Sequence, residues 1–306
     1  MKEQKHDLTS LWLPLLALMG VVVGCEGTAT SLADASPMPA DGSVPDARGL
    51  TGQDASLDAS LADREPVEDA TLPDPNTLFF SEDFEATPDD AVPDGWDSFV
   101  GYVVNMNNDP GGPAFALVDS SRPRGGNRAL HVRGGQQPAM LTRPLPSGVD
   151  RVYVRVYVWL TGRLGQNPGN NHETLLGIRA SVGGAHDEVR FGEIKGVIGT
   201  NEVPSDDISP KMDEWGMGPI IDAGRWNCLE VAFLANGPNH EVRAWNDGVE
   251  VHRVNDPSQW NNRGLGADFL ADKFNEFIVG WHSFSNYDNE IWFDDLVVAN
   301  ERVGCN

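Results

Sequence analysis

Residues 152–160, VYVRVYVWL, alternate strictly between two kinds of side chain. Every second residue is aliphatic, and those between are aromatic or cationic: Tyr153, Arg155, Tyr157 and Trp159. Because successive side chains of a β-strand point to opposite faces, the stretch predicts a strand with its aliphatic face in a hydrophobic core. The second face suits the concave side of a carbohydrate-binding sheet, which makes Tyr157 a candidate substrate-binding residue. A plain outer face is the alternative.

Strand patterns continue on both sides of this stretch. Residues 241–254, EVRAWNDGVEVHRV, form two alternating runs joined at Asn246-Asp247-Gly248, residue types that make a tight hairpin turn. Similar runs recur at NRALHV, EVRFGEI, CLEVAF, EFIVGW and EIWFDDLVV. No long helical period competes with them, apart from a turn or two at 267–274. Many short strands separated by turns predict an all-β fold, a two-sheet antiparallel sandwich.

The first 25 residues have the composition of an export signal. Lys2 and Lys5 precede an apolar run too short to span a membrane comfortably, and the run ends in Val22-Val23-Gly24-Cys25. This ending resembles the lipobox of bacterial lipoproteins, which implies that Cys25 carries the lipid. An ordinary signal peptide with an incidental cysteine is the alternative. We expect a lipid-anchored protein of the bacterial cell envelope, and the Glu that follows Cys25 favours the outer membrane or cell surface.

Residues 26–78 contain 11 acidic residues, two arginines and almost no aromatic side chains. Such a segment buries too little apolar area to offset its loss of conformational entropy on folding, so we expect a disordered linker. Like charges extend a chain. The segment is therefore expected to hold the folded part away from the membrane, with the lipid as the only membrane contact.

Residues 79–306 are long enough for one domain with a sizeable core, and a monomer is expected. This part has 33 acidic and 18 basic residues, a net charge of −15. Such an excess of negative charge disfavours a nucleic acid partner. An anionic polysaccharide remains compatible with it, provided that a local basic cleft exists.

Three cysteines in an exported chain leave one over, and the lipid accounts for Cys25. Cys228 and Cys305 are then expected to form a disulfide in an oxidising compartment. Two buried free thiols are the alternative.

Several segments together resemble one known family: YVRVYVWLTGRLGQNPGNNH (153–172), VRFGE (189–193), SDD (205–207), GRWNCLEV (224–231) and VGWHSFSNYDNEIWFDDLVVANERVGC (279–305). They are similar to the core domain of the cellulose-induced secreted fungal protein, a relative of glucuronan lyases. The resemblance covers nearly all of 79–306. It implies a concanavalin-like β-jelly roll with a structural calcium ion, and its matching cysteine pair supports the 228–305 disulfide.

The calcium ligands that the resemblance implies are Glu85 in SEDFE, Arg124 and Asn127 in RPRGGN, and Asp294 in FDD. Arg124 stands where the family has serine, which a backbone carbonyl ligand tolerates. Oxygen donors of this kind are those that calcium prefers. On the strand pattern Asp294 and Asp295 point to opposite faces, so only Asp294 is expected to bind directly. A set of polar turn residues without metal is the alternative.

A lyase for anionic polysaccharides must neutralise a uronate carboxylate, remove the neighbouring proton and protonate the leaving oxygen. His172, Arg190 and Asp207 fall at cleft positions of the family, and Lys195 follows Arg190 at the next turn. Two departures weaken the comparison, because Ile194 replaces a glutamine and Phe284 replaces an aromatic hydroxyl. A proton donor is then lacking unless Tyr287 or His282 replaces that hydroxyl, and Trp281 stands where the cleft wall of the family lies. Together with Tyr157 these are the candidate substrate-binding residues.

The sequence therefore predicts a surface-tethered carbohydrate-recognition jelly roll, with uronate-cleaving lyase activity by β-elimination as one outcome. A non-catalytic carbohydrate-binding module and a structural lipoprotein are the alternatives. No serine nucleophile elbow, phosphate loop or zinc motif occurs in the sequence. The paired-carboxylate strand motif E-x-D-x-x-E of glycosidases is also absent.

Overall fold

The computed structural model describes residues 77–100, 114–165, 172–180, 187–261, 264–284 and 287–305. The expected signal peptide with Cys25, and all but the last two residues of the expected linker, lie outside these ranges. Among the described residues no helix is both long and apolar enough to cross a membrane. The helical elements are two single turns of 3₁₀ helix, Met212–Glu214 and Pro257–Gln259.

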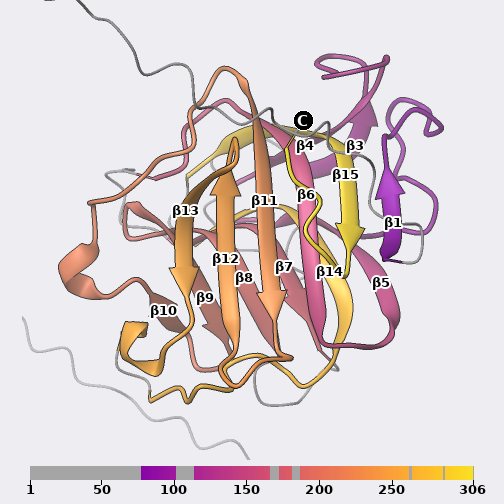
Figure 1. Ribbon diagram of the computed structural model, residues 1–306. Coiled ribbons are helices and arrows are strands. Elements are labelled where there is room, and N and C mark those ends of the chain that lie inside the picture. Colours follow the sequence, from indigo (N-terminus) through magenta and orange to yellow (C-terminus); the bar gives the residue numbers. More distant parts are fainter. Residues whose placement is uncertain are drawn as a thin grey trace, which may run out of the picture. The chain divides into compact units, whose positions relative to one another are not determined.

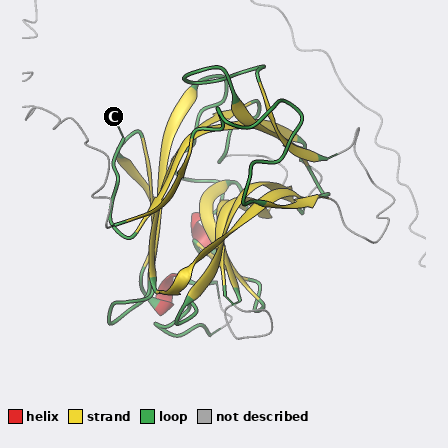
Figure 2. Cartoon of the chain, turned by 90° about the vertical axis from the view of Figure 1, so that its right-hand side faces the viewer, coloured by secondary structure: helices red, strands yellow, loops and turns green. Residues whose placement is uncertain are grey.

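The described chain forms two antiparallel β-sheets that face each other as two layers (Figures 1 and 2). The first sheet has the order β13-β12-β11-β6-β15-β4-β3, and β1 also pairs with β15. Its strands are β13 (Val249–Val254), β12 (Glu241–Asn246), β11 (Trp226–Leu234), β6 (Arg151–Leu160), β15 (Asn289–Ala299), β4 (Ala129–Gly134), β3 (Phe115–Asp119) and β1 (Leu78–Glu82).

The second sheet has the order β10-β9-β8-β7-β14-β5-β2 and lies behind the first in Figure 1. Its strands are β10 (Asp207–Ser209), β9 (Val197–Val203), β8 (Glu188–Ile194), β7 (His172–Arg179), β14 (Phe274–Ser283), β5 (Ala139–Val149) and β2 (Asp97–Val100). This arrangement confirms the predicted two-sheet antiparallel sandwich.

The core lies between the two sheets, and β6 supplies much of it. The five aliphatic residues of its alternating pattern have no exposed surface: Val152, Val154, Val156, Val158 and Leu160. They pack in one cluster with phenylalanines of the second sheet, such as Phe191 and Phe277. His252 of β13 also faces this interior, where its Nε2 lies 2.7 Å from Thr200 Oγ1 of β9. The predicted strand at 152–160 and its apolar face are therefore confirmed.

The predicted hairpin is also present. β12 and β13 are joined by Asp247 (φ 49°) and Gly248 (φ 79°), the two left-handed residues that a tight hairpin turn needs. β13 is an edge strand, and Arg253 on it pairs with Glu241 of β12 at 2.9 Å. The helical turn expected at 267–274 is absent, because residues 264–273 have no regular structure and β14 begins at Phe274.

The end of the chain is fastened to β11. Cys228 and Cys305 form the predicted disulfide, with Cα atoms 5.8 Å apart. Next to it the fully buried Glu230 accepts hydrogen bonds from the backbone N–H groups of Val303 and Gly304, each at 2.9 Å, and binds Arg302 at 2.7 Å. Because a buried carboxylate is stable only when it is paired, these contacts hold the last residues in place.

Candidate functional site

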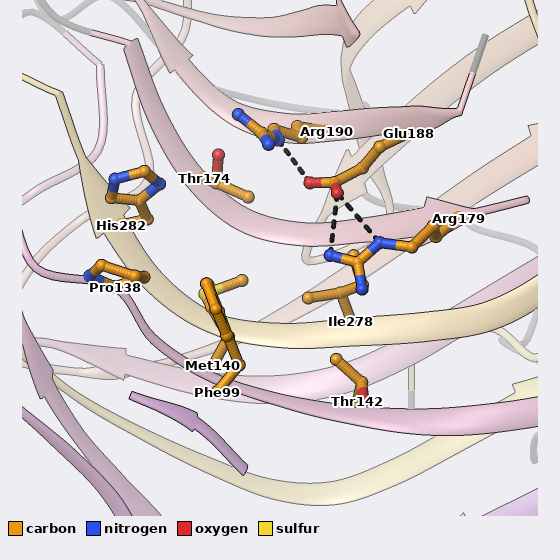
Figure 3. A pocket seen from close by; sticks show the side chains of 10 residues that line it. All are labelled: Phe99, Pro138, Met140, Thr142, Thr174, Arg179, Glu188, Arg190, Ile278 and His282. Atoms are coloured by element: carbon orange, nitrogen blue, oxygen red, sulfur yellow. Dashed lines mark hydrogen bonds and ion pairs between the residues drawn. The ribbon is translucent and has the colours of Figure 1, made fainter. Parts of the chain in front are cut away.

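A pocket of about 150 Å³ lies on the outer face of the second sheet (Figure 3). The register of β7, β8 and β14 places Arg190 opposite Gly177, and Gly177 opposite Ile278, so these residues share that face. Thr174 and His282 are likewise opposite each other. The lining residues come from five neighbouring strands and the segment before β5: Phe99, Pro138, Met140, Thr142, Thr174, Arg179, Glu188, Arg190, Ile278 and His282.

Beside Thr174 the strands β7 and β8 approach each other closely, and Gly192 makes this possible. A Cβ at this position would lie 1.8 Å from the backbone oxygen of Glu173, where the register of β7 and β8 shifts. No other residue type fits there without movement of the backbone. The glycine therefore permits the pairing of the two strands that carry Thr174 and Arg190.

An alternating chain of charges crosses the pocket. Glu188 binds Arg190 through one carboxylate oxygen and Arg179 through the other, with Arg179 Nη2 at 2.9 Å. Arg179 also binds Glu276 at 3.1 Å. Burial opposes ionisation of Glu188, but the two guanidinium groups outweigh it and hold the pKa of Glu188 below its usual value. Glu188 is therefore an anion shared by two arginines.

Two histidines flank Arg190. Burial, reinforced by the charge of Arg190, lowers the pKa of His282 to about 4. Burial also lowers the pKa of His172, against the opposing effect of Asp206, whose Oδ1 lies 3.6 Å from His172 Nδ1. Both imidazoles are consequently neutral at pH 7. Neutral imidazoles can accept a proton, whereas imidazolium groups cannot.

The predicted catalytic set is only partly brought together. His172 and Arg190 share the outer face, and Lys195, at the β8–β9 turn, is close enough to lower the pKa of His172. Asp207 does not join them. It pairs with Glu202 of β9, and Glu202 pairs with Val189 of β8. Because Val189 faces the core, Asp207 lies on the core side of the sheet. It is 1% exposed, and its carboxylate accepts the N–H of Ile208. Asp206, one residue earlier, approaches His172 instead.

Among the predicted substrate-binding residues, only His282 lines the pocket. Trp281 has no exposed surface, and its indole N–H donates to the oxygen of Tyr287, so it cannot stack on a sugar. Tyr287 packs against the core beside Trp281. Tyr157 lies on the first sheet, where the guanidinium carbon of Arg124 is 3.4 Å from its ring centroid. The structure therefore places Trp281, Tyr287 and Tyr157 outside the lining of this pocket.

The structure adds residues that sequence reasoning missed. Arg179 and Glu188 complete the charge chain, and the spacing of Glu188 two residues before Arg190 on a strand is the signal that could have found the first contact. Phe99 and Phe284 are apolar rings at the surface, 47% and 53% exposed. Phe99 lines the pocket, and the Phe284 ring lies 4.3 Å from that of His282.

The predicted calcium ligands surround a second site, at the loop of residues 124–128. Glu85 Oε1 accepts the backbone N–H groups of Asn127 and Arg128 at 2.7 and 2.9 Å. Asp294 Oδ2 accepts those of Arg124 and Gly125 at 2.8 and 3.3 Å. Two carboxylates from opposite ends of the domain thus hold one loop.

Asp294 and Asp295 do not point to opposite faces as expected. A one-residue bulge interrupts the pairing of β15 with β6 after Asp294, and Asp295 adopts a left-handed conformation (φ 48°). Asp295 therefore turns to the same loop, where it pairs with the side chain of Arg124. Asp294 is 1% exposed, and burial raises its pKa to about 6.

A family model named Cip1-like core domain, of the polysaccharide lyase-like group, matches residues 91–301. The chain belongs to this family. Membership confirms the resemblance seen in the sequence and supports a function related to carbohydrate.

The comparison with solved structures concerns the fold alone. The structure of "Cellulose induced protein, Cip1" superposes with a TM-score of 0.52 at 22% identity, covering 74% of this chain and 100% of that one. The likeness confirms the β-jelly-roll fold. An endo-β-1,4-glucuronan lyase from the fungus Trichoderma reesei is more distant, with a TM-score of 0.41, 15% identity and coverage of 74% and 96%. No curated protein matched the chain.

The neutral histidines predict how stability depends on pH. Burial also lowers the pKa of His252 to about 4, as for His282, whereas both should titrate near their usual pKa of about 6.5 in the unfolded chain. Protonation below pH 6.5 then favours the unfolded state. Stability should fall as pH drops from about 6.5 to 4, by up to about 1.4 kcal/mol per pH unit for each histidine.

Urea unfolding of the wild type and of His282→Asn at pH 7 and pH 4.5 tests this. The variant should lose less stability than the wild type over this interval, because it lacks one of the histidines whose pKa folding lowers. Identical losses would contradict the assignment of a neutral, buried His282.

Proposed function

We propose that the Cip1-like core binds a uronate-containing polysaccharide in the pocket on the outer face of the second sheet, which we call the groove. Arg190 would bind the carboxylate of the sugar. The observation that carries this proposal is the shared anion Glu188. When a substrate carboxylate engages Arg190, Arg179 still neutralises Glu188, so binding leaves no buried charge without a partner. An arginine also presents two parallel donors, which suit a carboxylate.

The rim of the groove supports the same ligand class. Phe99 and Phe284 offer exposed aromatic rings beside Arg190, and apolar ring faces suit the C–H surfaces of sugars. A groove with two arginines that share one carboxylate, and with two aromatic edges, suits a sugar ring that carries a negative group. The overall negative charge of the domain is compatible with this, since the local arginine supplies the attraction.

β-Elimination is a second candidate function, favoured by the two neutral histidines beside Arg190. With the carboxylate held by Arg190, one imidazole would accept the proton from C5 of the uronate. That electron pair would form the C4–C5 double bond while the C4–O4 bond breaks, and O4 would take a proton from water. Phe284 carries no hydroxyl, so the chain itself supplies no phenol for the last step at that position.

The groove predicts a loss of affinity in Arg190→Gln. Losing one charge-assisted contact of roughly 1.5 kcal/mol should weaken binding of oligoglucuronan about tenfold in calorimetry. Arg243→Gln is the matched control, because it removes a guanidinium from an ion pair with Glu250 on the first sheet. If Arg190→Gln binds as tightly as Arg243→Gln, the groove is not the binding site.

Elimination is tested by the ultraviolet absorbance of unsaturated products formed from glucuronan or alginate. Product that forms with the wild type and is reduced in His172→Asn or His282→Asn would support elimination. If no product forms, the protein recognises the polymer without cleaving it.

We also propose that a calcium ion binds at the 124–128 loop. The donor set fits: Glu85 and Asp294 bring carboxylates to one loop, Asn127 adds an amide, and Arg124 adds a backbone carbonyl. In the described residues Asp294 accepts hydrogen bonds from backbone N–H groups alone. No cluster of three acidic, histidine or cysteine side chains occurs in that part of the chain, so the remaining ligands would be the amide and carbonyl oxygens of the loop. The ion would neutralise a buried carboxylate and join β1, the loop and β15.

Removal of calcium tests this proposal. Ligand binding at a hundredfold excess over the dissociation constant adds about 2.7 kcal/mol, so a chelator should lower the wild-type melting temperature by several degrees. Asp294→Asn should lower it similarly and should respond little to the chelator. Asp295→Asn is the charge-matched control, and loss of its part-exposed pair with Arg124 should cost at most about 1 kcal/mol. A chelator without effect on the wild type would refute the site.

For the protein's location we propose lipidation at Cys25 and attachment to the bacterial outer membrane, supported by the lipobox-like Val22-Val23-Gly24-Cys25. The acidic segment that follows would act as the tether. Cys25→Ser expressed in a Gram-negative host should lose incorporation of radioactive fatty acid. Continued labelling of that variant would show that another residue, or none, carries the lipid.

A further inference from the structure

A row of aromatic side chains crosses the outer face of the first sheet, which faces the viewer in Figure 1. Trp226 of β11 is directly opposite Trp159 of β6, Trp159 is opposite Trp292 of β15, and Trp292 is opposite His131 of β4. Neighbouring rings touch: Trp159 meets Trp226 edge to face with centroids 6.1 Å apart, and His131 stacks on Trp292 at 4.2 Å. Four strands thus carry a row of neighbouring aromatic side chains, called here the aromatic band.

The residues of this band differ in exposure. Trp292 is 6% exposed, whereas Trp159, Trp226 and His131 are half-buried. The indoles of Trp159 and Trp226 lie away from the core between the sheets, whose aliphatic side is formed by the alternate residues of β6. Their large apolar area is therefore not needed to hold the two sheets together.

Arg122 lies over the band. Its guanidinium carbon is 4.3 Å from the ring centroid of Trp159 and 4.9 Å from that of Trp292. Within the described residues it forms no ion pair, and its Nε is buried without a hydrogen-bond partner. Because this Nε has no exposed surface, a ligand carboxylate would engage the terminal Nη atoms of Arg122, a residue that is half-buried as a whole.

Two other arginines of the same sheet also stack on a tryptophan ring, and they serve as a comparison for Arg122. Arg243 and Arg302 lie 4.7 and 4.2 Å from the ring of Trp245. Both of these arginines also bind glutamates, Arg243 with Glu250 and Arg302 with Glu230. In a domain with 15 more acidic than basic residues, Arg122 is different because it has the stacking contact without the carboxylate.

We propose that Trp226, Trp159 and Arg122 form a second binding surface for an acidic polysaccharide, on the sheet opposite the groove. A pyranose ring stacks on the accessible part of the half-buried indoles Trp226 and Trp159, and its carboxylate engages Arg122. Charge complementarity selects an anionic sugar, because Arg122 is a cation without an ionic partner at an aromatic platform. The surface shares its ligand class with the proposed groove but none of its residues.

Two sites on opposite faces would act differently from one longer groove. A single short oligosaccharide cannot reach both, so each protein molecule should bind two. In contrast, one face of the protein can bind one long polysaccharide chain while the opposite face binds a second polysaccharide chain. Effective concentration then strengthens attachment to a network of polymers without any change in either site.

Calorimetry with a short glucuronic acid oligosaccharide tests the proposal. The wild type should bind two molecules, and Arg190→Gln should leave one site of unchanged affinity. Adding Arg122→Gln or Trp226→Ala to that variant should weaken the remaining site about tenfold or more, while adding Arg243→Gln should not. A cello-oligosaccharide of equal length, which lacks the carboxylate, should bind this surface at least tenfold more weakly.

The proposal is overturned if Arg190→Gln abolishes all binding, if Arg122→Gln and Trp226→Ala match the Arg243→Gln control, or if the neutral oligosaccharide binds equally well. Unchanged melting temperatures show that each variant is folded, and Trp159→Phe serves in place of Trp226→Ala if the latter is not. The groove proposal fails separately, when Arg190→Gln leaves total binding unchanged. Binding that depends on Arg122 alone would retain the second surface and remove the groove.

Discussion

The pairing of β6 with β15 is the constraint on which the rest of the fold depends. β15 is bonded along one side to β6 and along the other first to β4 and then to β1, so the last strand of the chain holds three others. β6 in turn carries β11 and through it the outer hairpin. The bulge at Asp294 occurs where β15 changes partner from β4 to β1. The adjacent residues Asp294 and Asp295 consequently both contact the 124–128 loop. The pairing of β1 with β15 begins directly after this bulge, so the first and last strands meet beside the same loop.

The features that the sequence predicted correctly are those that follow from local patterns, such as strict alternation along a strand. Five aliphatic residues of β6 are in the core, and the Asp247-Gly248 turn joins β12 to β13, because a period of two and left-handed turn residues are local properties. The Cys228–Cys305 disulfide followed from counting and from the resemblance. These features depend on residues close in sequence, or on a chemistry with few possible partners.

Strand faces explain the errors at the site. On β14 Trp281 shares the face of Phe277 and Val279, so alternation alone places it in the core and His282 in the groove. The left-handed residue Asp206 (φ 56°) ends the turn before β10, and Asp207 then falls on the core side. For Asp295 the cause is the bulge after Asp294, because one extra residue reverses every later side chain and alternation cannot reveal where it is inserted. Glu188 and Arg179 were missed because their contact depends on the pairing of β7 with β8.

The ion pairs on the outer hairpin have a consequence for assembly. An edge strand presents unpaired N–H and C=O groups, onto which a strand of another molecule could add. On β13 the exposed positions include Glu250 and Arg253, and their cross-strand partners Arg243 and Glu241 fix charges along that edge. An incoming apolar strand would have to desolvate them. This edge is therefore protected against sheet extension and aggregation, even when many copies are crowded together.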